Sequence, residues 1–218
     1  MSAATPAGTV FVIDDDPSVR RALARQLRRA GFEVEAFASA QDYLEQPPPT
    51  GVACIVADVR MPGLSGLDLQ ASLAQARRDL PMVFITGYGD IPTSVRAMKG
   101  GAVNFLQKPF TDEAILAAVS EALARSRAVD DARRGYRGLD ARYRSLTARE
   151  REVLALVGAG LLNKLVAAQL GIAEKTVKIH RRRVMEKMGA ASFADLVRMA
   201  GRLAPPAAPG TADPSAPH

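Results

Sequence analysis

The sequence predicts a protein of the α/β plus all-α class: an α/β unit with a parallel sheet, then a small unit made only of helices. Residues 1–123 alternate short apolar runs with helical patterns, as in a parallel sheet covered on both faces. After residue 146 the patterns are helical alone. The charge divides in the same way, since residues 1–123 hold 11 Lys/Arg and 14 Asp/Glu while residues 124–218 hold 18 and 9. A basic second half favours a nucleic-acid partner for that half.

Five short apolar runs are the expected strands, at residues 10–13, 32–37, 52–57, 82–86 and 102–107. Helical patterns follow them, at residues 17–30 and from about Gly66, Ile91 and Thr111. Ligands of such sheets bind at the carboxyl ends of the strands. Residues of the first half that bind a ligand or take part in chemistry are therefore expected just after each apolar run.

The chain is expected to fall into four parts. The α/β unit occupies residues 9–123, and the Arg- and Ala-rich stretch 124–145 is a helical linker. Residues 146–204 form a four-helix unit. The tail 205–218 has nothing to bury and is expected to be disordered.

Several classes of protein are disfavoured by composition. No apolar run approaches the roughly 18 residues needed to span a bilayer, and the N-terminus lacks a basic start and an apolar core, so a cytoplasmic protein without a membrane partner is expected. Cys54 is the only cysteine and lies in an apolar run, which indicates a small core residue and excludes an internal disulfide.

Three carboxylates fall at predicted strand ends. Asp14 and Asp15 follow the first strand and Asp58 ends the third, and these two strands are neighbours in a sheet of this type. Hard oxygen ligands without His or Cys nearby favour Mg²⁺. Asp16 has a simpler explanation, because an Asp followed by Pro17 is a typical helix start.

Two further polar residues follow the fourth and fifth strands. Thr86 and Lys108 would supply a hydroxyl and an ammonium beside the carboxylates. Phosphoryl transfer needs its equatorial oxygens neutralised and held in line, which a metal, a lysine and a hydroxyl can do. A carboxylate can act as the nucleophile and become an aspartyl phosphate.

Residues 9–123 resemble the receiver domain of two-component response regulators through VIDDDPSVR, CIVADVRMPGLSG, MVFITGYGD and AVNFLQKPF. The resemblance implies a flavodoxin-like (CheY-like) five-stranded sheet in the order 2-1-3-4-5, which is the order known for that fold. It implies that Asp58 is the phosphoacceptor and that a sensor histidine kinase supplies the phosphoryl group. It also implies a cis peptide between Lys108 and Pro109.

The same resemblance assigns the remaining site residues. It implies that Mg²⁺ is bound by Asp15, Asp58 and the backbone carbonyl of Arg60, with Asp14 acting through water. Lys108 would pair with Asp58 or with its phosphate.

A switch is also implied. Thr86 would move to bond the phosphate, and Phe105 would turn in behind it, although Phe105 as a plain core residue is an equally open interpretation. In the FixJ subgroup, phosphorylated receivers pair through the face formed by the fourth helix, here residues 91–99, with the fifth strand. A homodimer on phosphorylation is therefore expected.

One alternative uses similar chemistry. Asp14 and Asp16 with Thr86 and Lys108 superficially resemble the haloacid dehalogenase class of phosphatases. That interpretation leaves Asp58 unexplained, and about 115 residues is small for such an enzyme.

In the second half, residues 160–190 hold two helical patterns joined at Gly171, as in a helix-turn-helix. On a helix over residues 174–188, one side is apolar and the opposite side is cationic. The apolar side holds Val177, Val184 and Met188, and the cationic side holds Lys175, Lys178 and Arg182 with Ile179 beside them. A cationic exposed side fits insertion into a major groove.

Residues 146–200 resemble the LuxR/NarL-type DNA-binding domain through LTAREREVLALVGAG and NKLVAAQLGIAEKTVKIHRRRVMEKMG, and the combination with this receiver resembles the FixJ subgroup. The resemblance places Lys178, Ile179 and Arg182 at base-reading positions. Phosphate-contacting positions fall on Lys175, Thr176, Asn163 and Lys164. Ala173 departs from the usual Ser or Thr cap of the recognition helix.

The sequence thus indicates a phosphorylation-controlled transcription factor and not an enzyme in its own right. Its expected partners are a sensor histidine kinase, an operator in double-stranded DNA and RNA polymerase. A metal-dependent phosphatase with a helical accessory unit, and a receiver with a helical protein-interaction module, are the alternatives. No GxxxxGK[ST] loop is present, which disfavours an ATP-driven activator, and His180 has no Cys or His partner for zinc.

Overall fold

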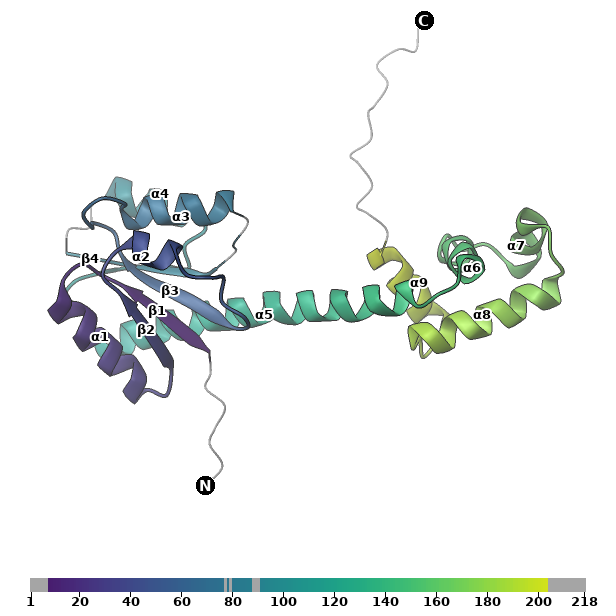
Figure 1. Ribbon diagram of the computed structural model, residues 1–218, viewed down its shortest axis with the longest axis horizontal. Helices are drawn as coiled ribbons and strands as arrows, with labels where there is room; N and C mark the ends of the chain where they lie inside the picture. Colours follow the sequence, from purple (N-terminus) through teal and green to yellow (C-terminus); the bar gives the residue numbers. More distant parts are fainter. Residues whose placement is uncertain (1–7, 77, 79, 88–90, 204–218) are drawn as a thin grey trace, which may run out of the picture. The chain divides into compact units, whose positions relative to one another are not determined.

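The computed structural model describes residues 8–76, 78, 80–87 and 91–203, and the tail expected to be disordered lies outside them. The chain divides between Asp131 and Ala132 into two compact units. Figure 1 labels the helices and strands of both units.

The first unit is built on a parallel sheet. Its strands are β1 (Thr9–Ile13), β2 (Glu33–Phe37), β3 (Ala53–Asp58), β4 (Met82–Thr86) and β5 (Asn104–Gln107). Their order is β2-β1-β3-β4-β5, and each neighbouring pair is parallel. The predicted fold class and strand order are therefore confirmed.

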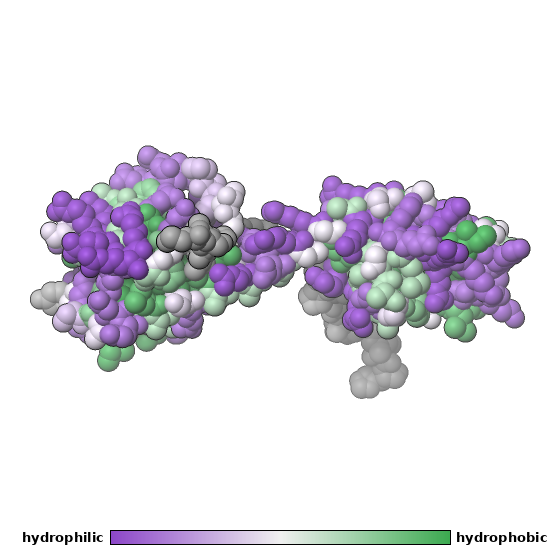
Figure 2. Space-filling model, turned by 90° about the horizontal axis from the view of Figure 1, so that it is seen from below, coloured by the Kyte–Doolittle hydropathy of each residue, from purple (hydrophilic) through white to green (hydrophobic). Residues whose placement is uncertain are grey.

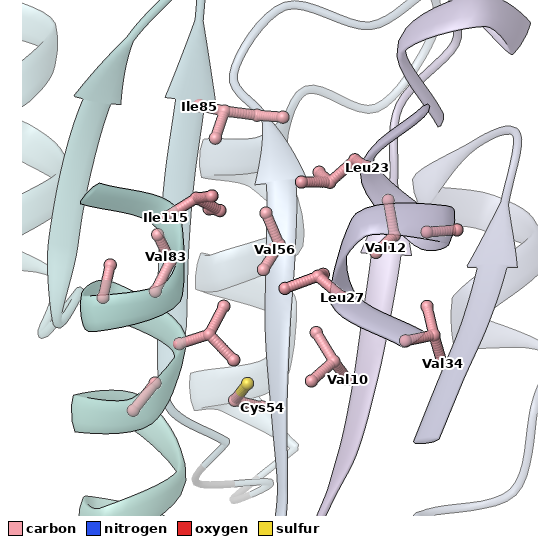
Figure 3. Close-up of a cluster of buried hydrophobic side chains, with 14 of the residues drawn as sticks. Val10, Val12, Leu23, Leu27, Val34, Cys54, Val56, Val83, Ile85 and Ile115 are labelled. Carbon is pink, nitrogen blue, oxygen red and sulfur yellow. The ribbon is translucent and has the colours of Figure 1, made fainter. Parts of the chain in front are cut away.

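Helices cover both faces of this sheet (Figure 1). They are α1 (Pro17–Arg29), α2 (Ala40–Leu44), α3 (Gly66–Gln75), α4 (Ile91–Lys99) and α5 (Asp112–Arg144). The alternation of side chains along a strand sends Val10 and Val12 to the face under α1 and α5, where Leu27 and Ile115 pack (Figure 3). Phe11 and Ile13 point to the other face, against α2, α3 and α4. Both faces being buried explains why these strands read as unbroken apolar runs.

The helix α5 is longer than a single domain needs. Ser126 lies beyond the expected receiver end at 123, yet it is buried, and its Oγ accepts a hydrogen bond of 3.0 Å from the Ala53 N–H. Nearer its end, the same helix supplies Leu139, which is buried in the core of the second unit. The stretch expected as a linker thus contributes side chains to both units.

The second unit packs α6 (Ala148–Gly158), α7 (Asn163–Leu170), α8 (Glu174–Met188) and α9 (Phe193–Leu203) with the end of α5. Val166, Val177 and Leu196 are fully buried between these helices. The joint between α7 and α8 turns at Gly171, whose φ of 64° lies in the left-handed region that favours glycine. This is the predicted helix-turn-helix. None of the described helices combines the length and apolar character of a membrane span.

Candidate functional site

The predicted acidic cluster forms at the carboxyl end of the sheet. β1 and β3 are neighbours, so Asp14, directly after β1, lies beside Asp58, the last residue of β3. One carboxylate oxygen from each of Asp14, Asp15 and Asp58 lies within 4.8 Å of the others. Asp14 is fully buried, Asp58 is nearly so, and Asp15 is exposed.

Lys108 stands against two of these carboxylates. Its Nζ donates to Asp58 Oδ2 at 2.7 Å and to Asp14 Oδ2 at 2.8 Å. The backbone N–H of Lys108 donates to the Thr86 carbonyl at 2.7 Å, and the peptide to Pro109 is cis. The resemblance had implied a pairing of Lys108 with Asp58, and the additional bond to Asp14 was not anticipated.

The electrostatics follow from burial. Burial raises the pKa of Asp14, and the hydrogen bond from Lys108 only partly opposes this rise. Burial also tends to lower the pKa of Lys108, but hydrogen bonds to Asp14 and Asp58 outweigh it and leave that pKa raised. The cluster thus holds three carboxyl groups and one ammonium, which bonds two of them, and this excess of hard oxygen donors fits Mg²⁺.

Backbone groups hold the carboxylates in place. Asp14 Oδ1 accepts from the Asp16 N–H at 2.9 Å, and Asp58 Oδ1 accepts from the Arg60 N–H at 3.0 Å. Gly66, at the start of α3, packs so closely on the Asp58 carbonyl that a Cβ there would collide with it. Asp16 caps α1 by accepting from the Ser18 N–H at 2.7 Å, as predicted. The role of the Arg60 carbonyl as a metal ligand stays a prediction.

The two expected switch residues lie near this edge of the sheet. Thr86 ends β4 and is fully buried. Phe105 lies on β5, partly buried, against the core under α2, α3 and α4. Beside them, α4 exposes three apolar side chains, with exposed fractions of 79% for Ile91, 43% for Val95 and 48% for Met98.

In the second unit, α8 has the two sides that its sequence predicted. Val177, Val184 and Met188 are fully buried. The charged side chains lie outside, and Arg182 is 83% exposed. Figure 2 shows the second unit from the side on which α8 is drawn in Figure 1. Most of the surface seen there is hydrophilic. Ala173 makes no side-chain cap to α8, as expected.

The residues at the start of α7 make a contact that sequence reasoning missed. The Asn163 side-chain oxygen accepts from Arg181 Nη1 at 3.3 Å. The same guanidinium lies 4.3 Å from the centre of the Phe193 ring. Lys164, the next residue, is exposed. Arg181 thus ties the starts of α7 and α9 to α8.

The capping arrangements at the starts of α6 and α9 differ in completeness. Thr147 and Glu150 form both reciprocal bonds. The buried Glu150 carboxylate also accepts from Lys187 Nζ at 2.7 Å, a pair that sequence spacing did not reveal. At α9, Ser192 Oγ accepts from the Asp195 N–H, but the Asp195 carboxylate accepts from Ala191 and not from Ser192. That second box is therefore only half formed.

Comparison with known families matches both units. Residues 10–120 match the response regulator receiver domain, and residues 144–200 match the bacterial regulatory proteins of the luxR family. Neither the phosphatase alternative nor a protein-interaction module accounts for both matches.

Comparison with individual proteins covers most of the chain. Nodulation protein W of Bradyrhizobium diazoefficiens is 52% identical over 89% of this chain and 86% of its own length. Transcriptional regulatory protein FixJ of Azorhizobium caulinodans is 45% identical over 88% of this chain and 90% of its own. The solved structure of response regulator StyR is 47% identical, has a TM-score of 0.80 and spans 89% of this chain and 98% of that one. The chain therefore belongs to the response regulators that join a receiver domain to a LuxR-type DNA-binding domain and regulate transcription.

Proposed function

We propose that Asp58 accepts a phosphoryl group from a sensor histidine kinase and that this modification controls DNA binding by the helical unit. The observation that carries the proposal is the pair of hydrogen bonds from Lys108 Nζ, 2.7 Å to Asp58 and 2.8 Å to Asp14, at the carboxyl end of the sheet. These bonds bring an ammonium to the carboxylate that would carry the new phosphate.

The chemistry is an in-line transfer. An Asp58 carboxylate oxygen attacks phosphorus, the new O–P bond forms, and the N–P bond to the kinase histidine breaks with its electron pair returning to the imidazole. Lys108 can then bond a phosphoryl oxygen. Asp14, Asp15 and Asp58 would hold Mg²⁺, which neutralises the charge on the phosphoryl oxygens when it is bound.

Replacement of the nucleophile tests this assignment. Asp58→Asn should abolish labelling by a small phosphodonor such as acetyl phosphate in the presence of MgCl₂. Asp42→Asn, at an exposed carboxylate of the same unit, is the matched control and should label normally. Normal labelling of the Asp58→Asn protein would show that another residue accepts the phosphate.

For DNA, we propose that Lys178, Ile179 and Arg182 read bases. Alanine at Lys178 or Arg182 should then cost about 1–3 kcal/mol at a specific site and relax sequence preference. Lys175→Ala should instead weaken binding to all duplexes alike and reduce the salt slope. Identical behaviour of the three variants would contradict the orientation proposed for α8.

Four residues are proposed to contact phosphates, which position the unit without reading sequence. They are Lys175, Thr176, Asn163 and Lys164. Asn163 is already held by Arg181, so its amide is oriented before DNA arrives.

We propose that phosphorylation produces a homodimer through α4 and β5, coupled by Thr86 and Phe105. The exposed Ile91, Val95 and Met98 supply an apolar surface for this contact. Sedimentation should show a monomer without beryllofluoride and a dimer with it. The dimer would bind a two-fold symmetric operator and act on RNA polymerase. Unchanged mass, or a dimer that survives charge reversal at Arg96 and Lys99, would place the interface elsewhere.

A further inference from the structure

We infer that Glu186 is a specificity-determining residue of the DNA-binding unit, because it orients the guanidinium of Arg182 for reading a base. The inference rests on the proposed function, in which Arg182 contacts bases. Glu186 was not among the residues expected to matter for DNA binding.

The geometry is a directed hydrogen bond. Glu186 Oε1 accepts from Arg182 Nε at 2.9 Å, one helical turn away on α8. A guanidinium carries five N–H donors in a rigid fork, and a bond through Nε leaves N–H groups on both terminal nitrogens. Two terminal donors are what a bidentate contact with guanine O6 and N7 requires. The carboxylate thus fixes the plane of the fork while leaving its reading edge available.

Helix stability does not account for Glu186. It lies near the C-terminal end of α8, where the helix dipole disfavours a carboxylate. A basic residue before an acidic one is also the weaker order for such a pair. The other pair on this helix differs, since Glu174 lies in the first turn, precedes Lys178, and is 3.5 Å from its Nζ. Both preferences explain Glu174, and neither favours Glu186.

Glu186 lies on the surface of α8 that the proposed function assigns to DNA. It lines a hollow of about 520 Å³ whose other lining residues include Lys178, Arg181, Arg182 and Met185. A carboxylate among these cations repels phosphates and so weakens binding to every duplex. This loss of affinity is offset if Glu186 raises the preference of the protein for the correct sequence over all others.

Two substitutions separate orientation from charge. Glu186→Ala and Glu186→Gln remove the same negative charge, but the glutamine amide oxygen can still accept from Arg182 Nε. Binding of the full-length, beryllofluoride-activated protein would be measured on a duplex that the wild type selects from a random pool, and on a scrambled duplex. Glu174→Gln, which removes a carboxylate beside a lysine whose ammonium needs no orienting, is the matched control.

We expect the ratio of specific to non-specific affinity to fall about three- to tenfold in Glu186→Ala, comparable to the cost of ordering one long side chain. The ratio should stay within about twofold of wild type in Glu186→Gln and Glu174→Gln. Replacing a contacted guanine by 7-deazaguanine, which lacks the N7 acceptor, should weaken the wild type more than it weakens Glu186→Ala.

Equal ratios for Glu186→Ala and Glu186→Gln would overturn the inference, because the carboxylate would then act only through its charge. Arg182→Ala distinguishes this failure from failure of the proposed function. If Arg182→Ala keeps full sequence preference, the assignment of Arg182 as a base reader is wrong. If it loses preference while Glu186→Ala does not, only the role of Glu186 is wrong.

Discussion

Lys108→Met is the most informative perturbation of the receiver site. The methionine keeps much of the aliphatic stem but removes the ammonium that bonds Asp14 and Asp58. Asp14 is fully buried, so it would lose its cationic partner and retain the repulsion from Asp58. The folded receiver should therefore be less stable when no Mg²⁺ is present.

The magnitude follows from burial and from the number of bonds. Breaking a buried ion pair costs roughly 3–5 kcal/mol. Two features reduce this figure. The Lys108 side chain is 21% exposed, and Asp14 can take up a proton and so avoid a buried unpaired charge. We expect a loss of about 2–3 kcal/mol in the free energy of unfolding at neutral pH.

The pH dependence has a definite sign. Burial raises the pKa of Asp14 above its ordinary value of 3.8. A carboxyl group whose pKa is raised on folding stabilises the fold below that ordinary value, and this contribution is lost as the pH rises through the folded pKa. Removing Lys108 raises the folded pKa further, because the ammonium no longer favours the charged form. The deficit of the variant should therefore be largest near neutral pH and shrink on acidification.

Native-state hydrogen exchange of the β1 and β3 peptides in urea and EDTA would report on this unit alone. The measurement would be made near neutral pH and about two pH units lower, corrected for intrinsic exchange rates. Lys99→Met, at an exposed lysine of the same unit, controls for loss of a positive charge. A variant as stable as wild type near neutral pH, or one whose deficit is the same at both pH values, would refute the role given to Lys108.

Three further outcomes are expected. Ala173→Ser should add about 1 kcal/mol to the free energy of unfolding of the helical unit, because α8 begins without a side-chain cap. The gain would be seen as a higher urea midpoint. No gain would mean that solvent already satisfies the backbone N–H groups of the first turn of α8. Lys187→Met should lower the free energy of unfolding of the helical unit by about 1–2 kcal/mol at neutral pH. This is less than the loss expected for a fully buried ion pair, because the Lys187 side chain is 38% exposed. The hydrogen bond from Lys187 lowers the pKa of Glu150 below its ordinary 4.5. In urea titrations the cost should therefore disappear as the pH falls through the pKa of Glu150 in the folded protein. A cost that does not change with pH would contradict the pairing. Burial raises the pKa of the Cys54 thiol to about 12, so iodoacetamide should label it rapidly in urea and very slowly in the native protein. Mass spectrometry would measure the labelling. Rapid labelling of the native protein would mean that the core opens easily.

The strand ends were predictable because each apolar run is short and ends at a polar residue. Asp14 and Asp58 could be placed together from sequence once the strand order was known, since parallel neighbours present their carboxyl ends at one edge. The second bond of Lys108, to Asp14, was not predictable, because it depends on how closely the chain segments after β1 and β5 approach each other.

Contacts between helices were the main omission in the second unit. The periodicity of α8 correctly predicted its buried and exposed sides. It could not reveal that Lys187 meets Glu150, or that Arg181 meets Asn163 and Phe193, because these partners depend on how the helices cross. Such contacts join residues 12 to 37 positions apart, and no local pattern encodes them.

The distribution of buried residues along α5 determines where the chain can be cut or recombined. A fragment that begins at Leu146 would lack Leu139, and also the Arg142 side chain, which donates to the Met188 carbonyl at 3.0 Å. It would expose part of the apolar core on which the recognition helix rests. Residues 131–138 are all exposed, so a junction there leaves both cores whole. A chimaera that exchanges receivers between relatives should therefore be joined within this stretch, where the exchanged side chains are exposed and the buried Ser126 and Leu139 stay with their own units.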